Sequence, residues 1–213
     1  LYHVMEKFNS NSMNNSIIVA DSGTTWDVTG QVLCLKKGQS FITNSAMGSM
    51  GFALPASAGI SASSKYHTYC LVGDGSIMTS LSSLWTIARD KLPITISNCS
   101  NNYGPYQFPE KLIPLVIMKA LNSQAIPIYG NGLNIRDWIH VDDHINAICL
   151  IIKSGKLGKT YCVGGSQEKT NQDVVNLICN LLDSYKDSSQ PHTKLIKHVK
   201  DRPAHDFRYS INS

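Results

Sequence analysis

The sequence has few charged residues: they make up 16% of its 213 positions, whereas about 25% is typical of soluble domains. The formal net charge is only +4, and no run of like charges occurs. The chain therefore lacks the basic footprint that attracts nucleic acids and anionic membranes, and we expect neither as a partner. With 42% hydrophobic residues, it is too apolar to remain disordered, so we expect a folded protein with a sizeable core.

Closely spaced cysteines are also missing. No two of the six cysteines stand in a CxxC or zinc-like spacing, so we expect buried free thiols in a reducing compartment. No apolar run approaches the roughly 20 residues that a membrane-spanning helix requires, and the first residues lack the apolar stretch of a signal peptide. These absences predict a cytoplasmic protein. The chain begins with Leu1 instead of Met, so a fragment of a longer protein stays an open hypothesis.

From Ile17 onward, apolar stretches of strand length alternate with segments of helix length. The stretches IIVA, TYCLVG and ITIS are the expected strands, and residues 51–62 and 81–89 are the expected helices. Strands that are apolar at nearly every position are buried on both faces of a parallel sheet. Before them lies a polar amino-terminal segment (1–16), in which residues 1–8 show no pattern and the stretch NSNSMNNS at 9–16 is interpreted as a linker or loop.

The alternation continues through the second half of the chain. The expected helices are residues 110–122, 145–152 and 171–182. The expected strands are IPIY, IRDWIHV, TYCVGG and residues 195–199. We therefore predict an α/β fold. It should have a mainly parallel doubly wound sheet with helices on both faces and a smaller carboxyl-terminal lobe of substrate-binding type.

Two glycine-containing motifs in the first half have the composition of a diphosphate site. Gly48 and Gly51 in GSMG precede an expected helix, whose free amide groups and dipole favour an anion. The second motif, GDGS at residues 73–76, follows an expected strand and contains Asp74, a hard oxygen ligand that suits Mg²⁺. Asn101 follows after one more helix and strand, so we expect both residues at the same sheet edge.

Residues 17–97 resemble the diphosphate-binding domain of thiamine-diphosphate enzymes of the acetolactate synthase and 2-oxoacid decarboxylase type. The resemblance implies thiamine diphosphate with Mg²⁺ as cofactors. It implies that the side chains of Asp74 and Asn101 and the carbonyl of Tyr103 are metal ligands. The implied cofactor-binding residues are Gly48, Ser49, Met50, Gly73, Asp74, Gly75 and Ser76. The chemistry of that family also needs a glutamate from a separate pyrimidine-binding domain, which this sequence does not contain.

The second half contains residues suited to a nucleoside diphosphate sugar. Arg136, Arg202 and Lys111 are cations, and the planar fork of arginine matches a diphosphate. Tyr129 offers a ring face for stacking. Amide side chains that can hydrogen-bond a sugar or a base are those of Asn101, Asn102 and Asn171.

Residues 98–213 resemble the carboxyl-terminal part of the dTDP-glucose 4,6-dehydratases, a family of extended short-chain dehydrogenase/reductases. The segments that carry the resemblance are NCSNNYGPYQFPEKLIPLVI, PIYGNGLNIRDWIHVDDH, TYCVGGSQEKTNQDVV and DRPAHDFRY. The resemblance implies NAD as a cofactor, with Asn102 near the nicotinamide, and leaves a homo-oligomer open. The implied nucleotide-sugar pocket consists of Asn101, Lys111, Leu112, Pro127, Ile128, Tyr129, Arg136, Asn171, Asp201, Arg202, Pro203 and His205.

The sequence departs from this second family in two respects. Ala204 stands where the family usually has glycine, and alanine is strained there if the position requires a positive φ. The glycine-rich NAD loop, the Tyr-x-x-x-Lys pair and the acidic pair for elimination are missing, since no lysine stands four residues after any of the nine tyrosines.

Four aromatic residues have structural interpretations. His140 and His144 have a metal-like spacing, but they straddle a strand-to-helix turn, which favours a structural or surface role over a metal site. Trp85 and Trp138 are expected in the core.

The two resemblances meet at ITISNCSNNYG, where Asn101 suits either family, so we interpret the chain as a fusion of two doubly wound parents. The expected domains are a polar segment (1–16), a partial thiamine-diphosphate-binding domain (17–97) and a partial dehydratase (98–213). The first functional hypothesis is a dehydratase-like polypeptide that binds a nucleotide sugar and is not catalytically complete alone. The second is a thiamine-diphosphate and Mg²⁺ binding module. The third is a non-catalytic remnant or an artefact of sequence assembly.

Overall fold

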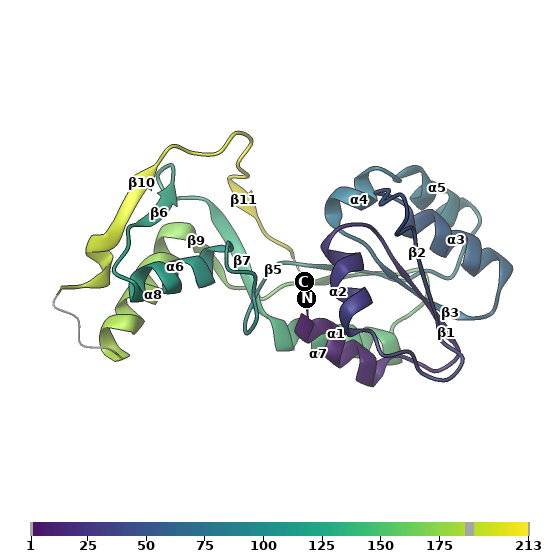
Figure 1. Ribbon diagram of the computed structural model, residues 1–213. Coiled ribbons are helices and arrows are strands. Elements are labelled where there is room, and N and C mark those ends of the chain that lie inside the picture. Colours follow the sequence, from purple (N-terminus) through teal and green to yellow (C-terminus); the bar gives the residue numbers. More distant parts are fainter. Residues whose placement is uncertain (1, 186–189, 213) are drawn as a thin grey trace. The chain divides into compact units, whose positions relative to one another are not determined.

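The computed structural model describes residues 2–185 and 190–212. The chain divides into two compact units, each built from two stretches of sequence (Figure 1). The first unit comprises residues 1–97 and 145–161, and the second comprises residues 98–144 and 162–213. Each unit therefore depends on residues that are distant in sequence.

A three-stranded parallel sheet forms the centre of the first unit. Its middle strand pairs on either side with a neighbour, in the order β2 (Ser40–Thr43), β1 (Ser16–Ala20) and β3 (His67–Leu71). In β1, Ile18, Val19 and Ala20 are fully buried, as expected for a strand that is apolar on both faces.

Helices alternate with these strands along the chain. They are α2 (Thr24–Val32), α3 (Ala53–Ser63), α4 (Asp74–Met78) and α5 (Ser82–Arg89). Leu54 and Ala58 of α3 form a buried cluster with Ile87 of α5. Burial of an aliphatic side chain such as Ile87 contributes about 1.5 to 3 kcal/mol, so this cluster holds the two helices together.

The amino-terminal segment contains a helix that the sequence analysis did not predict, and the linker predicted for residues 9–16 is wrong for residues 9–11. Residues Tyr2–Asn11 form helix α1. Met5 and Phe8 lie one turn apart on this helix, and both are buried in a cluster with Ile18 and Val28. Burial of these two side chains outweighs the low helix propensity of the Asn and Ser residues around them.

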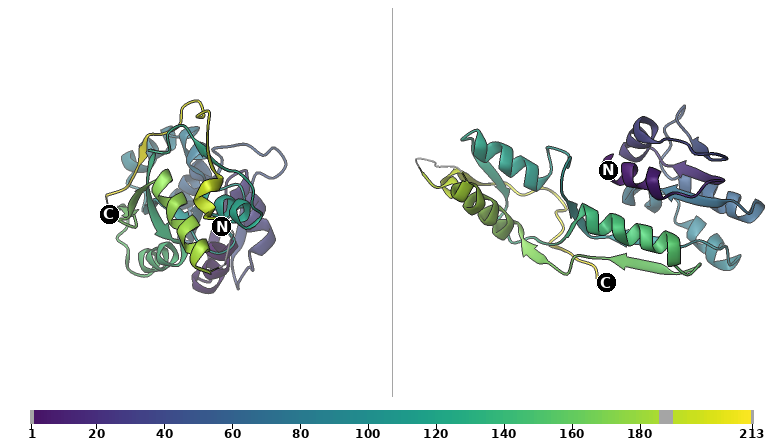
Figure 2. Two further views of the ribbon diagram at one scale, coloured as in Figure 1. Left: turned by 90° about the vertical axis from the view of Figure 1, so that its left-hand side faces the viewer. Right: turned by 90° about the horizontal axis from the view of Figure 1, so that it is seen from below.

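Two elements continue from one unit into the other along the chain. Helix α7 (Val141–Ser154) is continuous over its whole length (Figure 2). It begins at Val141 instead of the predicted Ile145, which places Asp142 and Asp143 in its first turn, where carboxylates stabilise a helix. The other element is the pair formed by β4 (Ile96–Cys99) and β8 (Thr160–Val163).

In the second unit, β7 (Ile135–His140) is a central strand. It pairs in parallel with β5 (Asn101–Tyr103) and β11 (Arg208–Tyr209), and antiparallel with β9 (Glu168–Thr170). A separate parallel pair consists of β6 (Ile126–Tyr129) and β10 (Ile196–Val199).

The core of the second unit lies between two helices and the β6 strand. Helices α6 (Leu112–Leu121) and α8 (Asn171–Tyr185) pack on each other, and the 3-10 helix η1 (His192–Leu195) leads into β10. The buried residues of this core are Val116, Ala120, Ile126, Ile128, Val175 and Cys179.

The predicted α/β fold class is confirmed, because helices alternate with strands that are mainly parallel. Within residues 2–185 and 190–212, however, the strands form four separate hydrogen-bonded groups instead of one continuous sheet. The all-apolar strands of the sequence predict burial correctly, but they do not say which strands pair.

Several smaller expectations can be compared with the structure. Trp85 is 64% exposed, so its predicted place in the core is wrong; the guanidinium carbon of Arg89 lies 4.9 Å from its ring centroid. Trp138 is half-buried. All six cysteines are free thiols, but only Cys179 is buried, and Cys34 and Cys162 are exposed, so the predicted burial is wrong for most of them. In the part of the chain that the structure describes, no helix combines the length and the apolar character needed to cross a membrane.

Candidate functional site

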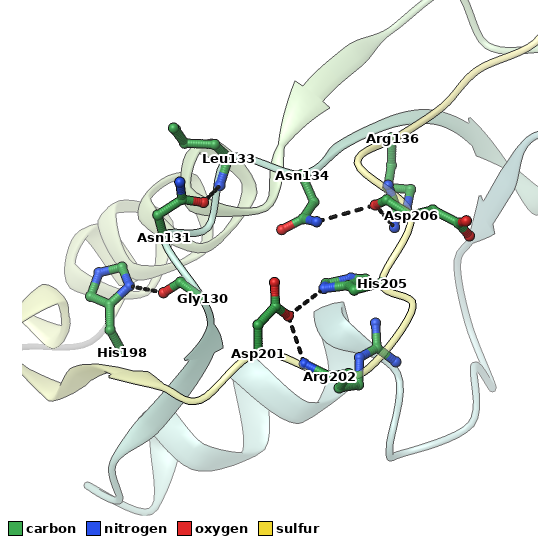
Figure 3. Close-up of polar contacts among 10 residues, drawn as sticks. All are labelled: Gly130, Asn131, Leu133, Asn134, Arg136, His198, Asp201, Arg202, His205 and Asp206. Atoms are coloured by element: carbon green, nitrogen blue, oxygen red, sulfur yellow. Dashed lines mark hydrogen bonds and ion pairs between the residues drawn. The ribbon is translucent and has the colours of Figure 1, made fainter.

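The turn between β6 and β7 forms one side of a polar cluster in the second unit (Figure 3). Gly130 and Gly132 have positive φ angles of 60° and 73°, which glycine adopts without strain. The carbonyl of Gly130 accepts a hydrogen bond from Nδ1 of His198 at 2.9 Å. A Cβ atom at Gly130 would lie 2.8 Å from Oδ2 of Asp201, so the turn is in direct contact with the loop after β10.

That loop, residues 201–206, forms the other side of the cluster. Oδ1 of Asp201 accepts hydrogen bonds from Nδ1 of His205 at 2.7 Å and from the backbone N–H of Arg202 at 2.8 Å. The hydrogen bond from His205, followed by that from the Arg202 amide, lowers the pKa of Asp201. Because the His205 side chain is only 5% exposed, this bond sets the orientation of an almost buried imidazole.

Ala204 in this loop has a φ of 54°. The position therefore does require the left-handed region in which an alanine is strained, as the sequence analysis anticipated.

Two guanidinium groups lie beside the loop. Arg136 donates from Nη1 to the Ile135 carbonyl at 2.7 Å and from Nη2 to the Asp206 carbonyl at 2.9 Å. The guanidinium carbon of Arg202 lies 5.2 Å from the ring centroid of Tyr129. A cavity of about 170 Å³ is lined by Arg136, Arg202, Pro203, Ala204, His205 and Asp206. Two arginines and an imidazole around one small cavity suit an anionic group such as a phosphate.

Other residues that the sequence analysis assigned to the nucleotide pocket lie at the ends of nearby elements. Lys111 directly precedes α6, of which Leu112 is the first residue. Asn171 is the first residue of α8. Its backbone N–H donates to the backbone carbonyl of Asn134 at 3.0 Å, and this bond connects the helix to the turn before β7. Pro127 and Ile128 lie in β6. The Ile128 side chain is 2% exposed and packs in the core, so only the backbone of this residue is available to a ligand.

Asn101 and Asn102 lie in β5. Both polar atoms of the Asn102 side-chain amide form hydrogen bonds. Its Nδ2 donates to the Ser100 carbonyl at 3.0 Å, and its Oδ1 accepts a hydrogen bond from Nδ1 of His144 at 2.9 Å. Burial lowers the pKa of His144, which favours the neutral imidazole. Within the described ranges, no group of three or more His, Cys, Asp or Glu side chains is placed to hold a metal ion. His140 and His144 therefore do not belong to such a group.

In the first unit, the two predicted diphosphate motifs lie next to each other. A Cβ atom at Gly75 would lie 3.5 Å from Cε of Met50, and one at Gly51 would lie 2.2 Å from Oγ1 of Thr79. Gly51 also has a φ of 81°. The GSMG segment therefore packs directly against α4, which begins at Asp74 of GDGS, and against Thr79 at its end, and glycine is required at position 51 for that approach.

The buried Asp21 holds the GSMG segment at the end of β1. Its Oδ1 accepts hydrogen bonds from the amides of Ser22 at 2.8 Å and Gly51 at 3.0 Å, and its Oδ2 accepts one from Ala53 at 2.9 Å. The side chain is fully buried. Sequence reasoning did not assign this residue a role, although an aspartate directly after an apolar strand was a signal for one.

The surroundings of Asp74 fit a metal-bound diphosphate. Asp74 is exposed, and its Oδ1 accepts a hydrogen bond from the Gly75 amide at 2.9 Å. Positions 48 and 73 have open space where a Cβ would stand. Because Asp74 belongs to the first unit, whereas Asn101 and Tyr103 belong to the second, a common metal site for the three residues stays a prediction.

Comparison with known proteins gives these two clusters a family context. The family model of GDP-mannose 4,6 dehydratase matches residues 84–213, which is more than half of the chain. The chain belongs to the GDP-mannose 4,6 dehydratase family. The model of the carboxyl-terminal TPP-binding domain of thiamine pyrophosphate enzymes matches residues 21–104. Both resemblances that the sequence analysis stated are thus confirmed.

Relatives within the dehydratase family cover mainly the second half of the chain. A probable dTDP-glucose 4,6-dehydratase of Sinorhizobium fredii is 56% identical over 122 residues, which are 57% of this chain and 35% of that protein. The chain thus spans about a third of the length of the curated relatives it matches.

Solved structures extend the comparison to the fold. A dTDP-glucose 4,6-dehydratase of Bacillus anthracis in complex with NAD is 40% identical, with a TM-score of 0.56, and the match covers 68% of this chain and 45% of that one. A dTDP-glucose 4,6-dehydratase of Streptomyces venezuelae matches 99% of this chain and 84% of its own, with a TM-score of 0.70. At 23% identity, this second similarity concerns the fold alone.

Proposed function

We propose that the chain binds a nucleoside diphosphate sugar of the dTDP-glucose type through residues 98–213. The observation that carries this proposal is the cavity of about 170 Å³ to which Arg136, Arg202 and His205 contribute. The relatives that match this half of the chain are named dTDP-glucose 4,6-dehydratases, which supports a dTDP sugar as the ligand.

The residues of the cavity have complementary roles in this proposal. A guanidinium group has five N–H donors, and Arg136 uses two of them on backbone carbonyls. The remaining donors bind the diphosphate while the arginine stays anchored. Arg202 adds a second cation next to the Tyr129 ring, which stacks with the base. The His205 imidazole, oriented by its hydrogen bond to Asp201, contributes a further polar group to the cavity lining.

Isothermal titration calorimetry with dTDP tests the proposal. We expect Arg136→Ala to weaken binding by about 2 to 4 kcal/mol, or roughly 30-fold to 700-fold, because the diphosphate loses a charge-assisted partner. Arg89→Ala is the matched control, since Arg89 pairs with Asp90 in the first unit. Equal dTDP affinities of the parent chain and Arg136→Ala refute the role of Arg136.

A second candidate function is the binding of thiamine diphosphate with Mg²⁺ by the first half of the chain. It is supported by the contact of the GSMG segment with α4, which contains Asp74 to Ser76 of GDGS, by the exposed Asp74, and by the family model over residues 21–104. In this proposal Asp74 holds the metal and Met50 supports the thiazolium ring. When bound, the cofactor supplies a carbon nucleophile; the residues of this chain bind and orient it.

Thermal unfolding tests this second candidate. Thiamine diphosphate with Mg²⁺ should raise the unfolding temperature by mass action, and Asp74→Ala should abolish the rise because it removes the anionic metal ligand. Asp27→Ala, which removes another exposed carboxylate of the first unit, is the control and should leave the rise unchanged. A parent chain that shows no shift at millimolar cofactor contradicts the proposal.

NAD is not assigned to residues of this chain. The 213 residues contain no G-x-G-x-x-G motif. The Asn102 amide, which the family resemblance places near the nicotinamide, is engaged with Ser100 and His144. The proposed function is therefore nucleotide-sugar binding without an NAD-dependent step.

A further inference from the structure

Asn134, the residue before β7, connects three segments of the candidate site. It is 5% exposed. Its side-chain Nδ2 donates to the backbone carbonyl of Asp206 at 3.1 Å. Its backbone carbonyl accepts a hydrogen bond from the backbone N–H of Asn171 at 3.0 Å. Figure 3 shows its side chain directed from the turn after β6 toward the loop of residues 201–206. One buried residue thus contacts the start of α8 and the loop that lines the cavity.

The Asp206 carbonyl receives a second donor from the same region. Nη2 of Arg136 lies 2.9 Å from this oxygen, and a carbonyl oxygen has two lone pairs, so both bonds form at once. Arg136 keeps this bond while its remaining donors bind a diphosphate, and the bond from Asn134 gives the Asp206 carbonyl a second anchor.

A purely local role for Asn134 in its turn is the alternative. That local role is already filled by Asn131, whose Oδ1 accepts a hydrogen bond from the Leu133 amide at 3.1 Å. The Asn134 side chain instead reaches a partner 72 positions away in the sequence. The next residue also bonds to this distant segment, because the backbone N–H of Ile135 donates to the backbone carbonyl of Phe207 at 2.8 Å.

We propose that Asn134 is a positioning residue for nucleotide binding, which holds the loop of residues 201–206 in its binding geometry before the ligand arrives. This inference rests on the proposed nucleotide-binding function. A loop that is ordered in advance does not lose its freedom on binding, so the bond from Asn134 increases affinity without touching the ligand.

Titration of dTDP into two variants tests the inference. Asn134→Ala removes the amide, and Asn134→Asp keeps its shape, but a carboxylate does not donate to a carbonyl. We expect both variants to bind dTDP about fivefold to tenfold more weakly. Asn122→Ala is the matched control, because its Nδ2 also donates to a backbone carbonyl, that of Met118 at 2.8 Å, outside the cavity lining. Parent-like affinity of both Asn134 variants overturns the inference.

Amide hydrogen exchange separates a positioning role from a general contribution to folding. In Asn134→Ala, exchange at the Ile135 amide should become at least about fivefold faster, while exchange at the buried Val175 of α8 should not change. Equal acceleration at both amides means that Asn134 supports the whole unit, and the inference is wrong. If the parent chain does not bind dTDP, the proposed function fails, and exchange at Ile135 alone decides whether Asn134 holds the loop.

Discussion

At the scale of single residues, Ala204 has a conformational cost within the candidate site. Its φ of 54° lies in the left-handed region, which costs a residue with a Cβ about 1 to 2 kcal/mol. The residue lines the same cavity as Arg202 and His205. Such strain persists only where the surrounding structure imposes the conformation.

We expect Ala204→Gly to raise the free energy of unfolding of the second unit by up to about 1 kcal/mol. Relief of the left-handed strain should exceed the entropy that glycine adds to the unfolded chain. Urea denaturation followed by circular dichroism measures the change. Ala120→Gly, inside helix α6, should have the opposite sign. If both substitutions destabilise the chain, Ala204 is not strained.

A second residue, His144, should make stability depend on pH. Burial lowers its pKa below the ordinary value of 6.5, so the unfolded chain takes up a proton at a higher pH than the folded chain does. The unfolded state therefore binds more protons just below pH 6.5, and the free energy of unfolding falls as the pH decreases through this window. Above the window, the contribution of His144 is fully present.

The pH effect of His144 is measured by urea denaturation at several pH values between 7.5 and 5. We expect the free energy of unfolding to fall less steeply in His144→Gln than in the parent chain, because the substituted side chain does not titrate. All other side chains are the same in both proteins, so the comparison isolates the contribution of His144. Identical pH dependence in the two proteins contradicts the prediction.

At the scale of elements, the connection between β8 and β9 runs directly against β7. A Cβ atom at Gly165 would lie 1.9 Å from the Trp138 carbonyl oxygen and 2.7 Å from its carbon, both in the backbone. The fully buried Asp137 accepts hydrogen bonds from the amides of Gly165 at 2.9 Å and Gln167 at 2.7 Å. The connection is therefore held to β7 by a carboxylate, at a place where no side chain fits between the two backbones.

Gly165→Ala should lower the free energy of unfolding of the second unit by at least about 3 kcal/mol. The clash involves backbone atoms, which cannot move away as a flexible side chain does. The control is Gly59→Ala in α3, where the Cβ position is open and alanine should stabilise the helix by about 1 kcal/mol. Denaturation curves of the two variants measure both effects. A change below about 1 kcal/mol in Gly165→Ala would falsify the close approach.

Elements with a continuous apolar pattern were predictable from sequence, and those that depend on distant partners were not. β1 and β6 were expected because their residues are apolar at successive positions. Helix α1 was missed because only Met5 and Phe8 signal it, and their importance depends on the cluster that buries them. Periodicity also predicted α7 but not its first turn, where Asp142 and Asp143 look like capping residues.

At the scale of the whole molecule, the chain contains two candidate sites. The first unit contains the GSMG and GDGS segments, which we propose to bind a diphosphate, whereas the second contains the arginine-lined cavity. The sequence contains neither a Tyr-x-x-x-Lys pair nor a glycine-rich NAD loop. Ligand binding by either half and turnover by the chain are therefore separate questions.

We expect the 213-residue chain not to convert dTDP-glucose to the 4-keto-6-deoxy sugar in the presence of NAD. Hydride removal needs a positioned base and a bound nicotinamide. The sequence contains neither the Tyr-x-x-x-Lys pair that supplies the base nor the glycine-rich loop that binds NAD. The alkali-induced absorbance of the keto sugar measures turnover, with a relative named dTDP-glucose 4,6-dehydratase as the positive control. Turnover above a blank without protein contradicts this expectation.

The sequence by itself determined the fold class and both family resemblances, because apolar periodicity and motif spacing are local properties, whereas the strain at Ala204 followed only once the structure gave its positive φ. The tertiary structure alone decided which strands pair, that Trp85 is exposed, and that Asp21 and Asn134 hold the loops of the two candidate sites. The bond between Asp21 and Ala53 spans 32 positions, and the bond between Asn134 and Asp206 spans 72. A short polar side chain does not encode such a partner; it is selected only when the folded backbone brings an unsatisfied donor or acceptor within reach.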